Sequence, residues 1–125
     1  MNRNKIINDK LNELSKSKFR SSFHLNEKMI SYINEKGMDT ISNHLIDFIN
    51  IKLSKYNKDS DGKQTPMKNH PVFIAQHACA CCCRSCLEKW HHIPKEKDLT
   101  INEKNYIYCL LMRWIEREYN NKYDI

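Results

Sequence analysis

The first third of the chain predicts two short amphipathic helices joined by a polar connector. The first is expected over residues 4–15, followed by a basic and polar connector over residues 15–22. The second is expected to follow Asn26, whose side chain can cap a helix, and to end at Gly37, because glycine accepts the left-handed conformation. Their apolar positions are Ile7, Leu11 and Leu14 in the first, and Met29, Ile30 and Ile33 in the second.

Two longer apolar stripes predict the main helices of the core. Asp39 or Thr40 can cap the first of these helices, and Thr100 with Glu103 forms a capping box at the start of a helix over residues 101–119. The stripes are Ile41, Leu45, Phe48, Ile49 and Leu53 in the first, and Ile107, Leu110, Leu111, Trp114 and Ile115 in the second. His44 lies on the apolar side of its helix, which is typical of a core or boundary residue.

The middle of the chain is less regular. Turn-forming residues over 56–70 predict a loop, and Pro71 suits the first turn of a helix. The apolar run 72–75 fits a helix or a buried strand, and a helix is favoured because no second strand is evident. Another short helix is expected over residues 82–90.

The pattern as a whole predicts an all-α fold. Five or six helices would surround one core, with a Cys/His-rich site between the two short central helices. The predicted organisation is a basic helix or extension over residues 1–17, one helical domain over 18–119 and a C-terminal tail over 120–125.

Composition indicates which kinds of partner and which cellular compartment to expect. The chain has 125 residues, enough for one domain, and a net charge of +6, with the excess in residues 1–23 and 61–99. Basic charge favours acidic partners such as nucleic acid. With no apolar signal core at the N-terminus and no apolar run of membrane-spanning length, we expect a cytoplasmic protein without a membrane partner, in which thiols stay reduced.

Candidate chemistry is concentrated between residues 70 and 92. Five cysteines lie within eight residues, Cys79 to Cys86, which is poor spacing for disulfides between distant elements and favours metal binding or thiol chemistry. Zinc prefers four sulfur or nitrogen ligands in a tetrahedron. The preferred set is His77, Cys83, Cys86 and His91, with Cys82 and His70 as substitutes. Because adjacent residues of a helix point about 100° apart, only one of Cys82 and Cys83 is expected to face the site.

Other interpretations of the cluster stay open. An iron–sulfur cluster could take four thiolates instead of zinc. In a thiol enzyme, Cys83 or Cys86 would be the nucleophile and His77 or His91 the base, although no substrate is indicated. The cysteines could also be small buried core residues.

A basic rim around the cluster suggests a nucleic-acid-associated module as an alternative function. Its cations could contact phosphates, although an ordinary solvated face has the same composition. They are Lys63, Lys68, Arg84, Lys89 and Lys95.

Several phrases of the sequence resemble a small bacterial family that is known only as a domain of unknown function. They are FRSSFHL (19–25), KGMDTI (36–41), DGKQTPM (61–67), HPVFIAQHA (70–78), CCRSCLEKWHHIP (82–94) and MRWIE (112–116). The resemblance covers roughly residues 18–117 and implies no activity. It implies that the loop 61–70 belongs with the Cys/His segment.

The resemblance also changes the ligand set. Small polar residues often stand in that family where this chain has Cys79 and Cys81, so neither is expected to be an essential ligand. The candidate metal ligands become His77, Cys82, Cys83, Cys86 and His91. The candidate pocket residues are His70, Gln76, Lys63, Gln64 and Arg84.

Overall fold

The fold is all-α, as the sequence predicts. A computed structural model describes residues 3–59 and 61–123, and it contains no strand in these ranges. Its α-helices are α1 (Arg3–Ser15), α2 (Glu27–Lys36), α3 (Met38–Phe48), α4 (Pro71–Ala78), α5 (Arg84–His91) and α6 (Ile101–Tyr123). A 3₁₀ turn, η1 (Arg20–Ser22), follows α1, and a π-helical turn, η2 (Ile49–Leu53), extends α3.

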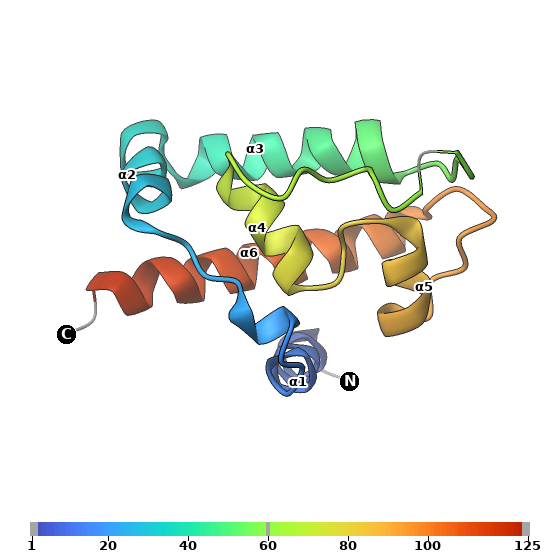
Figure 1. Cartoon of the computed structure of the whole chain (residues 1–125), viewed down its shortest axis with the longest axis horizontal. Helices are drawn as coiled ribbons and strands as arrows, with labels where there is room; N and C mark the ends of the chain where they lie inside the picture. Colours follow the sequence, from blue (N-terminus) through green and yellow to red (C-terminus); the bar gives the residue numbers. More distant parts are fainter. Residues whose placement is uncertain (1–2, 60, 124–125) are drawn as a thin grey trace.

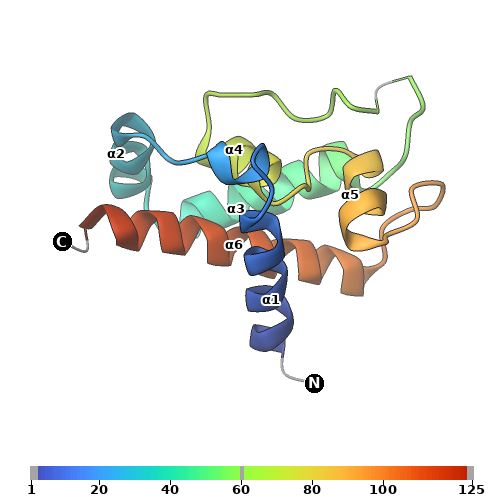
Figure 2. The ribbon, with the colours of Figure 1, turned by 60° about the horizontal axis from the view of Figure 1, so that its bottom comes forward.

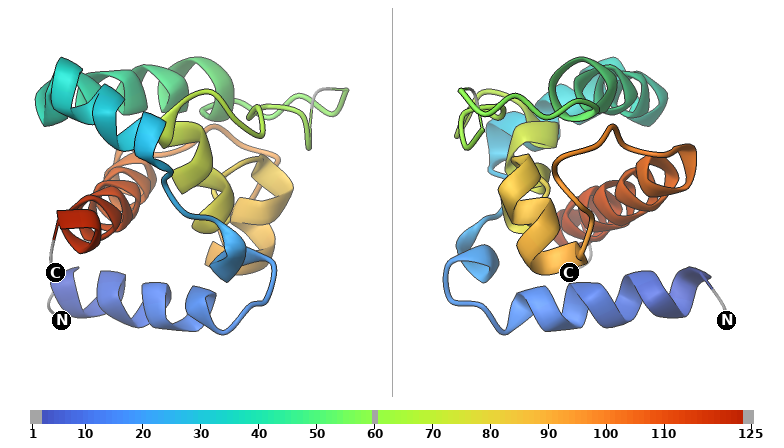
Figure 3. Two further views of the ribbon diagram at one scale, coloured as in Figure 1. Left: turned by 60° about the vertical axis from the view of Figure 1, so that its left-hand side comes forward. Right: turned by 90° about the vertical axis from the view of Figure 1, so that its right-hand side faces the viewer.

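The two longest continuous helical stretches form the frame of the domain. Figure 1 shows α3 with η2 and α6 running in opposite directions, with the short α4 between them. The N-terminal α1 crosses α6 at a steep angle, which is clearest in Figure 2. Helix α5 lies beside the C-terminal end of α4, as both views in Figure 3 show. The loop between α4 and α5 lies close to η1 and to the long loop after η2, because Arg20 and Thr65 both form hydrogen bonds with Cys82.

Local signals explain most helix boundaries. The Asn26 side chain accepts a hydrogen bond from the Met29 amide, and Gly37 ends α2 with a φ of 89°. Thr100 and Glu103 form the predicted capping box, with reciprocal bonds of 3.1 Å and 2.8 Å. The prediction of Asp39 or Thr40 as the cap of α3 is wrong, because Gly37 both ends α2 and caps α3, and the helix has already begun at Met38.

The apolar stripes meet in one core. Every predicted stripe contributes to it, and three side chains of α1 are buried in it. Helix α6 is longer than predicted and ends at Tyr123, so it includes most of the predicted tail, whose last two residues lie outside the described ranges. In the described ranges, no helix combines the length and the hydrophobicity that crossing a membrane requires.

Candidate metal centre

The cysteine segment follows the turn that ends α4. The amide of Cys81 donates to the Gln76 carbonyl at 2.8 Å and that of Ala80 to the His77 carbonyl at 3.4 Å. This is a Schellman motif with Ala80 in the left-handed position that glycine usually takes, at a φ of 58°. The chain then turns back towards α5, and the next three residues are all cysteines.

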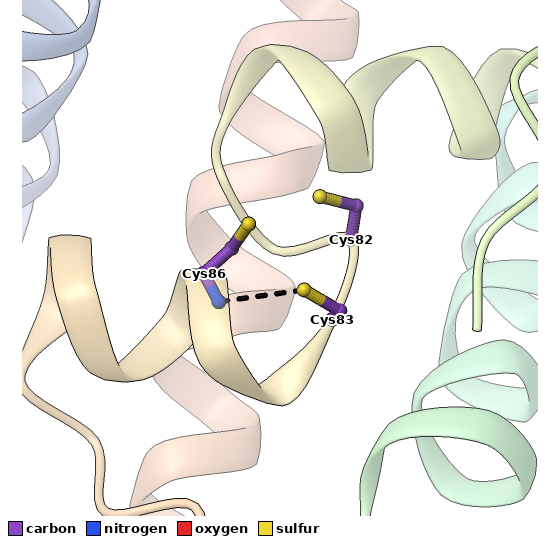
Figure 4. A group of neighbouring side chains, drawn as sticks. All are labelled: Cys82, Cys83 and Cys86. Atoms are coloured by element: carbon purple, nitrogen blue, oxygen red, sulfur yellow. Dashed lines mark hydrogen bonds between the residues drawn. The ribbon is translucent and has the colours of Figure 1, made fainter. Parts of the chain in front are cut away.

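Three thiols converge at the start of α5. The Sγ atoms of Cys82, Cys83 and Cys86 all lie within 4.8 Å of one another (Figure 4). Cys83 caps α5 with an extended backbone, and its Sγ accepts the Cys86 amide at 3.4 Å. The expectation that only one of Cys82 and Cys83 faces the site is wrong, because α5 begins at Arg84 and neither residue is on the helix.

Arg20 completes this group from a distant part of the chain. Its guanidinium donates to Cys86 Sγ at 3.3 Å, to Cys82 Sγ at 3.7 Å and to the His77 carbonyl at 2.7 Å. The side chain is only 8% exposed, and its charge lies against the rings of Phe19 and Trp90. The predicted polar connector thus contributes a buried cation, which no local spacing indicates.

The environment favours a negative charge on this group. Hydrogen bonds from the Cys82 and Cys83 thiols, and then from Arg20, hold the pKa of Cys86 well below its usual value. The pKa of Cys82 is raised in turn, by its hydrogen bonds with Cys83 and Cys86 and by burial. A lowered pKa favours the thiolate form of Cys86, which is the form that binds metals.

The two predicted histidine ligands are not part of the thiol group. His77 uses Nε2 to contact the Pro66 carbonyl at 3.0 Å, and its ring stacks on Phe23. His91 uses Nδ1 to contact the Tyr106 hydroxyl and Nε2 to contact the Cys79 carbonyl, both at 2.8 Å. The geometry therefore brings together three of the five predicted ligands, and no fourth His, Cys, Asp or Glu joins them among the residues that the structure describes.

A cysteine–histidine contact does exist, but elsewhere in the core. His91 Nε2 lies 3.7 Å from Cys81 Sγ. Burial lowers the pKa of His91 to about 4 and raises that of Cys81, so both groups are neutral. Cys79 and Cys81 are both 0% exposed and belong to the core. This pair does not supply the nucleophile and base that the thiol-enzyme interpretation needs.

Part of the loop 61–70, which the resemblance assigns to the Cys/His segment, is bound to the cysteine segment through residues 61–66. Thr65 Oγ1 donates to the Cys82 carbonyl at 2.7 Å, and Gln76 Nε2 donates to Thr65 Oγ1 and to the Cys81 carbonyl, both at 3.2 Å. Gln64 braces the same loop through the Gly62 amide. Of the predicted pocket residues, Gln64 and Gln76 thus lie beside the site.

His70 and Lys63 do not lie among the thiols. His70 caps the opposite end of α4, a helix of 8 residues and so about 12 Å long, and contacts His44 at 2.9 Å. Lys63 is exposed on the loop.

The basic rim is smaller than predicted. Lys63, Lys68 and Lys89 are exposed, whereas Lys95 is partly buried and donates to Ser85. The inclusion of Arg84 in this rim is wrong. Its side chain is 0% exposed, and its guanidinium donates to four backbone carbonyls, those of Leu53, Ser54, Pro94 and Lys97. An arginine enclosed in the interior cannot reach a phosphate.

Comparison with known families identifies the family to which the chain belongs. The sequence model of a family described as a domain of unknown function, DUF4186, matches residues 8–116. The chain is a DUF4186 domain. The match includes the loop 61–66, all three thiols and Arg20, so the complete group lies inside the DUF4186 domain. No solved structure matches the chain.

Proposed function

We propose that this domain binds one zinc ion through Cys82, Cys83 and Cys86. The observation that carries the proposal is the convergence of three Sγ atoms within 4.8 Å. Zinc–sulfur bonds of about 2.3 Å in a tetrahedron place neighbouring sulfurs about 3.8 Å apart, which this spacing accommodates. With three protein ligands, a water or another exogenous group takes the fourth position, which is the arrangement of catalytic rather than purely structural zinc sites.

The close spacing favours a single ion over an iron–sulfur cluster. In a cubane cluster each cysteine binds a different iron, so the sulfurs lie around the whole cluster rather than around one atom. Cys83 is the N-cap of α5, Cys86 lies in the first turn of this helix, and Cys82 adjoins Cys83. Three thiolates on consecutive or near-consecutive residues suit one small centre.

The charge of the surroundings favours a divalent ion. Three thiolates around a divalent cation leave a net charge of about −1, and a buried charge needs a partner. Arg20 supplies one positive charge next to Cys82 and Cys86. A monovalent ion in the same shell would leave an unbalanced negative charge.

Metal content tests the proposal directly. Protein purified without an affinity tag is expected to contain about one zinc per chain by elemental analysis, and Cys86→Ala is expected to lose most of it because one of three ligands is removed. Cys109→Ala is the matched control, since Cys109 lies on α6 outside the thiol group. Iron in place of zinc would redirect the assignment to a cluster. Well-folded wild-type protein without metal, even after incubation with zinc, would refute it.

A nucleic-acid partner is a second proposal, which the exposed lysines of the loop and of α5 support. Lys63, Lys68 and Lys89 lie on the two elements that border the thiols. Binding to a single-stranded oligonucleotide at low salt should weaken as salt rises, and Lys63→Glu with Lys68→Glu should weaken it further. Lys5→Glu on α1 is the control. Binding that does not depend on salt, or no binding at about 50 mM salt, would refute this proposal.

A further inference from the structure

We propose that the loop 61–66 positions the thiols for metal, with Thr65 and Asp61 as its positioning residues. The inference rests on the proposed metal binding, and it assigns a role to residues outside the ligand set. The loop binds the backbone on both sides of Cys83. Thr65 binds the carbonyl of Cys82, and Asp61 binds the amide of Ser85.

Thr65 acts on the first side. Its hydroxyl donates to the Cys82 carbonyl at 2.7 Å and accepts from Gln76, and it is 9% exposed, so water does not compete for these bonds. Gln76, which is 1% exposed, also donates to the Cys81 carbonyl. These two side chains fix the orientation of both peptide groups that precede Cys83.

Asp61 acts on the second side. One carboxylate oxygen accepts from the Ser85 amide at 3.3 Å and from Gln64, and the other accepts from the Ser85 hydroxyl. A carboxylate at a free helix amide also stabilises the start of a helix. Asp61 therefore holds the first turn of α5, which carries Cys86, against the same loop that holds Cys82.

The physical consequence concerns where the sulfurs lie. Cys82 and Cys83 are in irregular backbone, whose torsion angles no helical ladder maintains. Without the loop, the Cys81–Cys82 and Cys82–Cys83 peptide groups could rotate, and Cys82 Sγ would leave the centre. Groups that orient ligands in this way commonly change metal affinity by about 10- to 100-fold.

Cobalt(II), whose absorption reports its coordination, is the probe. Thr65→Val removes only the hydroxyl, and we expect cobalt affinity to fall about tenfold and the thiolate-to-cobalt absorption to change shape, while circular dichroism stays helical. Thr65→Ser should restore both, because serine returns the donor. Thr40→Val, on α3, is the control for the same chemical change. A merely structural role for Thr65 would lower stability without altering the absorption.

The outcomes separate this inference from the proposed function. Equal cobalt affinity and absorption in Thr65→Val, Thr40→Val and the wild type would overturn it. If the wild type binds no cobalt, the metal proposal fails, and phenylarsine oxide, which bridges neighbouring thiols, then decides the positioning. Weaker capture by Thr65→Val than by Thr65→Ser supports positioning, and equal capture refutes it. Should Thr65→Val not fold, Asp61→Asn takes its place, with Asp59→Asn as the control.

Discussion

Arg84→Ala is expected to lower the free energy of unfolding by about 4 kcal/mol, a large effect for a single substitution. The guanidinium donates to the carbonyls of Leu53 and Ser54 at the end of η2, and to those of Pro94 and Lys97 in the loop before α6. Alanine would leave these oxygens without their donor and create a cavity. Urea unfolding followed by circular dichroism measures the change.

Two companion variants distinguish this role from loss of surface charge. Arg84→Lys keeps the charge, but its single ammonium cannot reach both pairs of carbonyls, so we expect about half of the loss. Lys89→Ala, an exposed position of the same helix, should change stability by less than about 0.5 kcal/mol. An Arg84→Ala variant as stable as Lys89→Ala would show that the four carbonyls are satisfied in some other way.

The second large effect is a loss of stability in acid that depends on His70. This residue accepts the Val72 amide at Nδ1 and lies 2.9 Å from His44 Nδ1 through Nε2, so it is neutral in the fold. Burial, and then the neighbouring His44, lower the pKa of His70 to about 4. The unfolded chain takes up the proton near pH 6.5, while the folded protein resists it down to about pH 4.

The direction of the stability change with pH follows from the difference between the pKa of His70 in the folded and the unfolded chain. The contribution of His70 is fully present above pH 6.5 and is lost as the pH falls from 6.5 towards 4, by about 3 kcal/mol at most. His70→Asn can still cap α4 but does not titrate there, so the difference in unfolding free energy between the wild type and this variant should shrink over that range. His24→Asn is the control, because His24 is exposed. A difference that stays constant between pH 7 and pH 4.5 would contradict the assignment.

The helices of this domain could be predicted because their signals are local. Asn26, Gly37 and the Thr100–Glu103 capping box act within one turn of their own helix, and the stripes of α3 and α6 repeat at the period that buries one face. The exception at α3 is also local in origin. Gly37 serves two helices at once, so the neighbouring Asp39 and Thr40 had no cap to form.

The thiol group shows where local reasoning ends. The density of cysteines identified the segment, and the three cysteines that the resemblance leaves after Cys79 and Cys81 are set aside are the ones whose sulfurs lie together. The choice of histidines could not be made from spacing, because the hydrogen bonds that occupy His77 and His91 come from Pro66 and Tyr106. These partners are 11 and 15 residues away in the chain.

What the sequence by itself determined is thus the all-α class, most helix boundaries, the core stripes and the segment that carries the chemistry. Only the tertiary structure decided the contacts of three polar residues, Arg20, Thr65 and Arg84. Arg20 reaches sulfurs 62 and 66 positions away, Thr65 holds the Cys82 backbone, and Arg84 is buried although it lies among the cysteines. The physical reason is that a buried polar group needs hydrogen-bond partners, and these come from segments that the packing of the helices brings close. Local periodicity does not predict which distant segments will be close.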